Sequence, residues 1–205
     1  MAKIKLTKAE LKKQRDALCQ YERYLPTLQL KKQQLQLEIN YQINILTERK
    51  QAESKKREAI RPWVGLLADP GVDISKWIKL RDVVTRAKNI AGIDIPVFVM
   101  AQFEPAEYDL FGTPLWVDVA VEAFKGLITL EKEIATIDEG VRILKQELRI
   151  TAQRVNLFEK VKIPQAREAI HLIKIYIGDQ MANAVGRSKI AKRKIEDMAL
   201  VEVAA

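Results

Sequence analysis

Histidine and cysteine are almost absent from this sequence, which excludes several kinds of site. The chain has one cysteine, Cys19, and one histidine, His171, among its 205 residues. A structural zinc site takes about four ligands and a disulfide takes a pair of thiols, so the chain builds neither unless another protein contributes. Scarce cysteine also favours a reducing, cytosolic setting. We expect Cys19 and His171 to lie on helix flanks without a role in catalysis or proton transfer.

The motifs of catalysis and of membrane insertion are absent as well. The sequence contains no phosphate-binding Gly-x-x-x-x-Gly-Lys-Ser/Thr loop, no Gly-rich dinucleotide fingerprint and no pairing of a nucleophile with histidine. No apolar run approaches the roughly 18 residues of a transmembrane helix, and residues 1–11 alternate charged with apolar side chains, unlike a signal peptide. We therefore expect no catalytic, cofactor or metal residues, and contact with a membrane only through other proteins.

Aromatic residues are few and charged residues are many, at 6% and 30% of the chain. This composition is lean for a compact globular core and fits an elongated protein better. The formal net charge of +8 indicates an anionic partner, although charge alone does not choose between nucleic acid, a membrane surface and an acidic protein. Lys and Arg are missing between Lys88 and Lys125, so the middle of the chain is acidic and its two ends are basic.

What the sequence does contain, from Trp116 to Phe158, is an unbroken heptad repeat. Apolar or small residues recur at alternating steps of four and three residues, and charged residues dominate the positions between them. Such a repeat, sustained for about six heptads, predicts a helix whose narrow apolar stripe needs a partner helix along its length. The coiled-coil seam residues assigned to this stripe are Leu127, Leu130, Ile134, Ile137, Val141, Leu144, Leu148, Val155 and Phe158.

The partner stripe lies in the first sixty residues. Thr7 and Glu10 form a capping box that starts a helix, and the pattern continues through Pro26 to a stop near Arg61. Its apolar seam is close to a heptad repeat and is broadened by further apolar side chains. The seam comprises Leu11, Leu18, Leu25, Leu28, Leu35, Ile39, Ile43 and Leu46, and the residues that broaden it are Tyr21, Leu30, Leu37, Tyr41 and Ile45.

Between the two helices the period changes to that of strands. Trp77–Lys88 and Ile93–Phe103 are rich in β-branched and aromatic residues, with a turn over Asn89–Gly92, and they predict a small antiparallel hairpin. Helices on either side of a compact insertion run antiparallel. The expected fold is mostly α: a long antiparallel two-helix coiled coil from residues 1–61 and 116–205, with a small head at 62–115 that projects from the far end of the helices.

The helical pattern does not stop at Pro164. It resumes at Ile170 with one extra residue inserted, which indicates a bend or stutter rather than an end. The second helix is then longer than the first, so the segment after about Tyr176 is expected to continue as a nearly single helix. Its residues are small and weakly apolar, and a lone helix of this kind is marginal in water without an enclosing partner.

Three stretches of the sequence resemble a known family. Arg154-Val155-Asn156 with Glu159 and Ile163-Pro164 is similar to the Arg-Val-Asn…Glu…Ile-Pro signature of the D subunit of the V-type (A/V-type) ATP synthases, the central rotor shaft. The segment Lys88–Pro96 resembles that family's Lys-Asn-x-x-Gly-x-x-x-Pro head motif, and Leu28–Leu35 occupies the place of its Leu-rich, Lys-rich first-helix motif. The tail from Gly186 to Lys194 resembles the bacterial branch.

The resemblance implies a non-catalytic protein that transmits torque between the catalytic ring and proton or sodium translocation. Its implied partners are the alternating catalytic A and B subunits, the F subunit, and the socket protein, which is the C subunit (called d in eukaryotes). The implied location is cytoplasmic, on the inner face of the membrane as part of the complex. The residues assigned to contacts with the catalytic ring are Lys3, Lys5, Lys8, Arg187, Ser188, Lys189, Lys192, Arg193 and Lys194.

Two other functions remain open from the residues alone. The basic ends would permit a coiled-coil protein to bind nucleic acid, although residues 1–18 and 185–205 lack the aromatic side chains on which bases stack. A coiled-coil chaperone or adaptor is the other alternative, and its head is expected to expose a large apolar patch.

Overall fold

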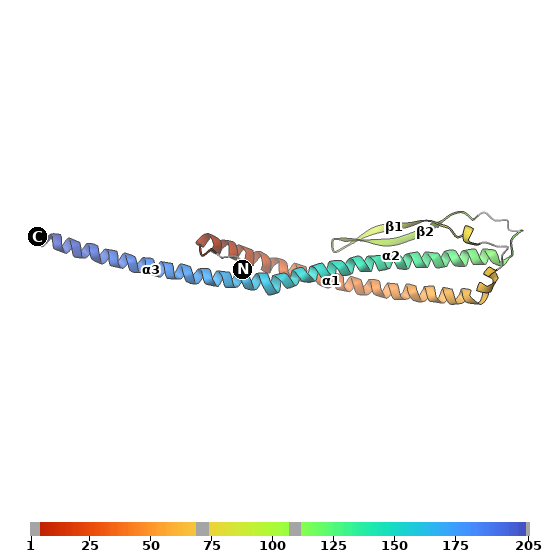
Figure 1. The fold of residues 1–205 in the computed structure, drawn as a ribbon, viewed down its shortest axis with the longest axis horizontal. Helices are drawn as coiled ribbons and strands as arrows, with labels where there is room; N and C mark the ends of the chain where they lie inside the picture. The colour runs from red at the N-terminus through yellow and green to blue at the C-terminus, as the bar shows by residue number, and fades with distance from the viewer. Residues whose placement is uncertain (1–4, 69–73, 107–111, 204–205) are drawn as a thin grey trace. The chain divides into compact units, whose positions relative to one another are not determined.

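The computed structural model describes residues 5–68, 74–106 and 112–203, and within these ranges the side chains of 67–68 and 198–203 are not described. Long helices dominate, and one two-stranded antiparallel sheet lies between them in the sequence (Figure 1). This is the mostly helical fold with an inserted hairpin that the sequence predicts. In chain order the elements are α1 (Lys8–Ile60), the 3-10 helices η1 (Arg61–Ala68) and η2 (Ile74–Lys76), β1 (Leu80–Ile90), β2 (Ile93–Phe103), α2 (Trp116–Leu157), the π-helical turn η3 (Phe158–Lys162) and α3 (Ile163–Val203).

The chain forms two compact units, and each combines parts of both helical segments. One unit comprises Met1–Gln29 with Ala152–Ala205, and the other comprises Leu30–Thr151. The second unit contains the hairpin and both short 3-10 helices. The sequence analysis divided the chain differently, into three consecutive segments at 1–61, 62–115 and 116–205. That division stays a prediction.

Local signals account for the ends of α1. The Thr7 hydroxyl oxygen accepts a hydrogen bond from the backbone N–H of Glu10 at 3.2 Å, which satisfies one of the free donors at the start of a helix. The helix runs through Pro26 without ending. It stops at Ile60, directly before Arg61-Pro62, because a residue before proline is disfavoured in the α conformation.

The hairpin has a two-residue turn at Ala91 and Gly92. Both residues have positive φ, at 52° and 78°, which is the requirement of the turn type that matches the twist of paired strands. Asn89 supports the turn, because its side-chain oxygen accepts from Gly92 N–H at 3.1 Å and its amide donates to Asp94 at 2.6 Å. The first strand begins three residues later than predicted, since Trp77 lies in a turn against a small core formed by Ile74, Val117, Ala120 and Val121.

The hairpin folds back along the helices, so the expectation that it projects from their far end is wrong. Its tip residues Ile93 and Ile95 are buried in one core with Leu35 and Ile39 of α1 and Leu144 of α2. Figure 1 shows both strands lying alongside α2. Burial of the isoleucines at the tip provides the physical reason, because their apolar area is removed from water only against the helices.

The residues expected to broaden the seam of α1 divide into two groups. Tyr21 and Ile45 are half-buried, as predicted. Leu30, Leu37 and Tyr41 are instead exposed, and for them the prediction is wrong. A helix turns by about 100° per residue, which places Leu37 about 160° around the helix from the buried Leu35. These three side chains therefore point away from the core of their unit.

In the other unit the long second helix passes Pro164 through a π-helical turn. The backbone N–H of Ile163 donates to the carbonyl of Phe158, five residues earlier, in place of the usual four. Proline has no N–H to donate and clashes with the preceding turn, and the wider π turn accommodates one extra residue there. The predicted stutter before Pro164 is confirmed, and the helix continues to Val203.

Candidate functional site

The coiled-coil seam of the second helix consists of residues that are all shielded from water to some degree. Leu130, Val141, Leu144 and Val155 are buried. The other seam residues, Leu127, Ile134, Ile137, Leu148 and Phe158, are half-buried. In the unit Leu30–Thr151, Leu144 is fully inaccessible and packs in the core with Leu35 and Ile39 of α1.

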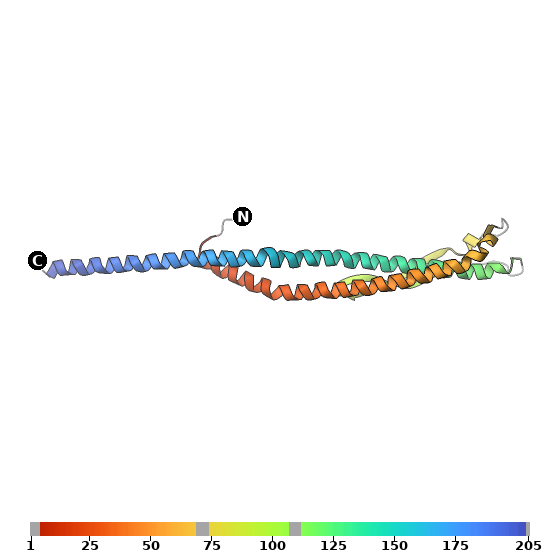
Figure 2. The same cartoon turned by 90° about the horizontal axis from the view of Figure 1, so that it is seen from below.

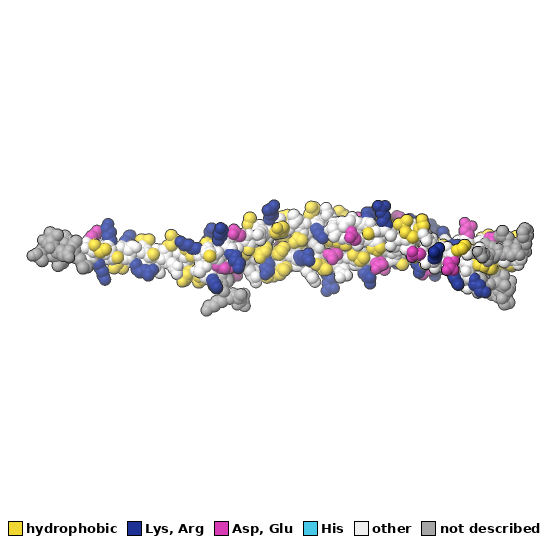
Figure 3. All heavy atoms as spheres, turned by 90° about the horizontal axis from the view of Figure 1, so that it is seen from above, with side chains coloured by type: hydrophobic (Ala, Val, Ile, Leu, Met, Phe, Trp, Pro, Cys, Tyr) yellow, Lys and Arg dark blue, Asp and Glu magenta, His cyan; other side chains and the backbone are white. Residues whose placement is uncertain are grey.

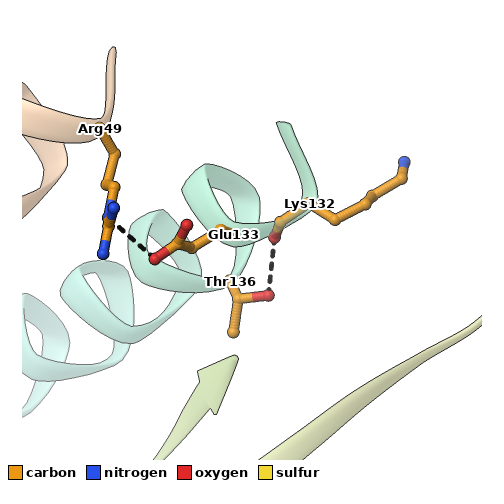
Figure 4. A network of polar contacts seen from close by, with 4 residues as sticks. All are labelled: Arg49, Lys132, Glu133 and Thr136. Atoms are coloured by element: carbon orange, nitrogen blue, oxygen red, sulfur yellow. Dashed lines mark hydrogen bonds and ion pairs between the residues drawn. The ribbon is translucent and has the colours of Figure 1, made fainter. Parts of the chain in front are cut away.

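A polar network accompanies this packing at the middle of α2 (Figure 4). Arg49 of α1 forms an ion pair with Glu133 of α2 at 2.9 Å, with 47% and 19% of the two side chains exposed. Three residues further on, the hydroxyl of buried Thr136 donates to the carbonyl of Lys132 at 2.8 Å. Its hydrogen bond is thus satisfied within its own helix, and its small side chain is compatible with a buried position. The ion pair links α1 to α2 at this level.

In the unit Met1–Gln29 with Ala152–Ala205, two contacts join α1 to the second helix. The ring of Tyr21 stacks on that of Phe158, with centroids 5.4 Å apart and planes 24° from parallel. Arg167 donates to the carboxylate of Glu22 at 2.8 Å, and both side chains are largely exposed. The first π-helical residue, Phe158, therefore packs directly against α1.

Past these contacts α3 continues as a single helix. Ile173 is buried and Ile177 is half-buried, whereas every residue from Gly178 to Asp197 is exposed. Figure 2 shows the helix extending well beyond the start of α1. The apolar residues on this segment are largely open to water, with Met181 at 60%, Val185 at 56% and Ile195 at 68% exposure. The predicted single-helix continuation after about Tyr176 is confirmed for the described residues. We call residues 178–197 the overhang.

The overhang carries most of the basic residues assigned to the catalytic ring. Arg187, Ser188, Lys189, Lys192, Arg193 and Lys194 are all exposed on it. Figure 3 shows Lys and Arg side chains spread along α3 with apolar side chains between them. Only one ion pair is formed by these cations among the described residues, a 3.7 Å contact between Lys192 and Glu196.

The remaining predicted ring contacts lie at the other terminus. Lys5 and Lys8 are exposed at the start of α1. Lys3 lies outside the described residues. Ile177 is the last described residue of α3 that is shielded from water. The cations of the overhang therefore lie beyond the paired part of the helices.

One surface was not predicted from the sequence. At the C-terminal end of α1, a groove of about 770 Å³ is lined by apolar side chains of Ile60, Val64, Phe124 and Leu127, with Arg57, Glu58 and Arg61 beside them. A second, smaller groove nearby is lined in part by Trp63 and Val119. Val64 is 45% and Val119 63% exposed. Val64 and Val119 are apolar residues that lie outside the heptad positions, and this pattern is the signal from which the grooves could have been predicted.

Two kinds of feature are missing from the described residues. No group of histidine, cysteine or carboxylate side chains within the described part of the chain is arranged to hold a metal ion. Among the same residues no helix is long and apolar enough to cross a membrane. Three surfaces of the described residues are exposed and partly apolar: the overhang, the grooves at the end of α1, and the face of α1 that carries Leu30, Leu37 and Tyr41.

Comparison with known proteins decides the family. The family model for the D subunit of ATP synthase matches residues 10–193. The chain belongs to this family. It is 45% identical over 195 residues to the D subunit of a V-type ATP synthase from Borreliella burgdorferi, covering 95% of this chain and 96% of the relative. It is 36% identical to the D subunit of Chlamydia caviae over 95% of each chain, and 33% identical to that of Chlamydia pneumoniae over 94% of this chain and 93% of the relative.

Membership of the D-subunit family confirms the resemblance based on the motifs around Arg154, Lys88 and Leu28. These relatives are bacterial, in agreement with the branch indicated by the tail from Gly186 to Lys194. The family match favours this assignment over the two alternatives from the sequence, a nucleic-acid-binding protein and a chaperone or adaptor.

Proposed function

We propose that this D subunit is the central-stalk rotor of a V-type ATP synthase. In this proposal it transmits torque between ATP synthesis or hydrolysis in the catalytic ring and proton or sodium translocation across the membrane. In this role the chain contributes no catalytic, cofactor or metal residues. The segments 1–61 and 116–205 form the shaft and residues 62–115 its inserted head. The chain acts on the cytoplasmic face and reaches the membrane only through the complex.

The overhang is the observation that carries this proposal. A single helix of about 20 residues is marginally stable in water, so a partner that encloses it would supply the missing contacts. Its surface suits a moving contact, because it combines small residues such as Ala184 and Gly186 with exposed cations. Exposed cations attract acidic surfaces over about 10 Å at moderate salt without forming fixed, buried pairs. We assign the overhang, with Lys5 and Lys8, to the interior of the ring of A and B subunits.

The second contact surface in this proposal is the pair of grooves at the end of α1. Exposed apolar side chains that are rimmed by polar and charged residues are typical of protein contact sites. We assign these grooves, rather than the hairpin, to the socket protein, the C subunit (d in eukaryotes), because the hairpin is packed back against the helices. The F subunit is the third partner in this proposal.

The test of the ring contact is a binding titration with the purified catalytic ring. The variant Arg187→Gln, Lys189→Gln, Arg193→Gln removes three exposed cations of the overhang. The matched control, Lys50→Gln, Lys55→Gln, Lys145→Gln, removes three exposed cations from α1 and α2. Only the first variant should bind the ring more weakly, and the loss should be larger at low salt, where screening is weaker. Equal affinities for both variants at two salt concentrations would contradict the assignment.

Rotation tests the proposed role itself. A cysteine at the exposed position Thr85, in a Cys19→Ser background, attaches a bead to the hairpin of the assembled complex. The bead should rotate when ATP is added to the immobilised ring. A complex that hydrolyses ATP while the bead stays still would overturn the rotor role.

A further inference from the structure

The unit that contains both termini has a backbone defect on each of its two helices. Pro26 lies inside α1 and has no N–H, so the carbonyl of Glu22, one turn earlier, has no donor within the helix. On the second helix the π-helical turn η3 replaces the usual hydrogen-bond ladder, and Pro164 again lacks a donor just after it. Defects of this kind are the places where helices bend.

Side-chain contacts place the two defects at the same level. Tyr21 and Glu22 lie in the turn of α1 before Pro26. The ring of Tyr21 stacks on Phe158, the first residue of η3, with centroids 5.4 Å apart. The carboxylate of Glu22 accepts a hydrogen bond at 2.8 Å from Arg167, which lies beyond η3. One turn of α1 therefore spans the π-helical turn of the second helix.

Packing between the helices is sparse at this level. Between Val155 and Ile163 every residue of the second helix except Phe158 is exposed. No described residue of α1 as far as Gln29 is buried. The ion pair of Glu22 with Arg167 adds little stability, because its side chains are 47% and 65% exposed. The contact here thus lacks the interlocked apolar side chains that make a coiled coil stiff.

Coiled-coil packing requires none of these defects. The seam advances by three residues from Val155 to Phe158, by five to Ile163 and by three to Ala166. Deletion of one residue from the exposed stretch 159–162 would turn the step of five into a step of four and restore the heptad repeat without loss of a buried side chain. Both prolines are exposed as well. The extra residue and the prolines therefore call for another explanation than the packing of the helices.

We propose that Pro26, Pro164 and η3 together form a compliant joint in the chain. Under torque the paired helices twist and bend at this level more than along their uninterrupted stretches, because fewer backbone hydrogen bonds and no buried side chain of α1 resist the motion. The stacked rings of Tyr21 and Phe158 keep the helices in contact during the motion. The use of the joint rests on the proposed rotor function, since it lets one end of a shaft turn briefly ahead of the other. Its compliance is a property of the free chain.

Two matched variants isolate the joint. The stiffened variant, Pro26→Ala with Pro164→Ala and deletion of Lys160, restores the hydrogen-bond ladder of both helices and the heptad repeat. The control variant, Gln29→Ala with Gln165→Ala and Lys160→Ala, introduces alanines at neighbouring exposed positions and removes the same charge, but keeps both prolines and the length of η3. Circular dichroism checks that both fold. If the deletion disturbs folding, Pro26→Ala with Pro164→Ala takes the place of the stiffened variant.

Amide hydrogen exchange of the purified full chain is the first measurement. Residues 158–166 should exchange at least about tenfold more slowly in the stiffened variant than in the control, because the restored hydrogen bonds must open before exchange occurs. Residues 120–130 of α2 are the internal reference and should exchange equally in both. Equal exchange of residues 158–166 in the two variants would overturn the proposal.

The second measurement uses the assembled complex with a bead attached at position 85. With the ring immobilised and no ATP present, the angular spread of the bead should be narrower in the stiffened variant than in the control, because thermal fluctuations of a spring decrease as its stiffness rises. Beads that rotate with ATP but have the same angular spread in both variants would overturn the joint. Beads that never rotate would contradict the rotor role, and hydrogen exchange would then decide on the joint alone.

Discussion

Gly140 of α2 lies against the backbone of Pro96 in β2. A Cβ atom placed on Gly140 would be 3.8 Å from the carbonyl oxygen of Pro96 and 3.9 Å from the Cβ of Ile95. These are ordinary van der Waals distances, so the site has room for one methyl group and for little more. The contact therefore excludes side chains larger than that of alanine at this buried position, but it does not require glycine, which costs stability inside a helix.

Gly140→Ala should therefore stabilise the protein, whereas Gly140→Phe should destabilise it. The methyl group fits and reduces the conformational entropy of the unfolded chain, for a gain of about 0.5–1 kcal/mol in the free energy of unfolding. A phenyl group would push β2 away from α2. Thermal unfolding measures the first effect, and amide hydrogen exchange of residues 93–97 measures the second. Faster exchange in the alanine variant would contradict the geometry.

Leu144→Ala should cost about 2–5 kcal/mol, because a fully buried leucine leaves a cavity between the two helices and the hairpin. Met181→Ala is the matched control, since Met181 lies on the overhang and is 60% exposed. Its cost should stay within about 0.5 kcal/mol. Urea unfolding followed by circular dichroism compares the two, and similar costs would mean that Leu144 does not lie in the seam.

The ion pair between Arg49 and Glu133 should contribute little to stability. Arg49 is about half exposed, and such pairs are typically worth about 0.2–1 kcal/mol. A double-mutant cycle with Arg49→Met and Glu133→Gln isolates the pairwise energy. That energy should fall further at high salt. A coupling several times larger would indicate that the pair is more strongly shielded from water than its exposure suggests.

Truncation after Ile177 should leave the coiled coil intact and remove binding to the catalytic ring. The deleted residues that are described make no buried contact, so the melting temperature should move by no more than about 2 °C. Truncation after Phe158 is the contrasting variant, because it also removes Ile163, Ala166, Ala169, Ile170 and Ile173, which are buried. If the shorter deletion melts like the longer one, the overhang has partners within the chain.

Replacement of residues 80–103 by a short linker should destabilise the helices themselves. The hairpin covers Leu35, Ile39 and Leu144, and its removal exposes them to water. At about 25 cal/mol per Å² of apolar surface, the loss should reach several kcal/mol and lower the melting temperature clearly. The helix-end grooves do not include these residues, so attachment to the socket protein should persist in the chains that remain folded. An unchanged melting temperature would show that the hairpin is not part of the core.

Motifs with a local cause were predictable from the sequence. The capping box at Thr7, the stop before Pro62 and the stutter before Pro164 each depend on a few neighbouring residues and on the chemistry of hydroxyl and proline. Among the assigned functional residues, the cations of the overhang could be found because the second helix is visibly longer than the first. The grooves at the end of α1 could not, since they depend on how η1 packs against α2.

The sequence by itself determined that the chain forms two long helices with a hairpin between them, because heptad period, turn residues and prolines act locally. Only the tertiary structure decided which apolar residues are buried. Leu35 and Leu37 are both leucines on one helix, and they differ because the hairpin returns to cover one side of α1 and leaves the other to water. The return of the hairpin depends on long-range burial of Ile93 and Ile95 against Leu144, about 50 residues further along the chain, and no local pattern records a contact of that separation.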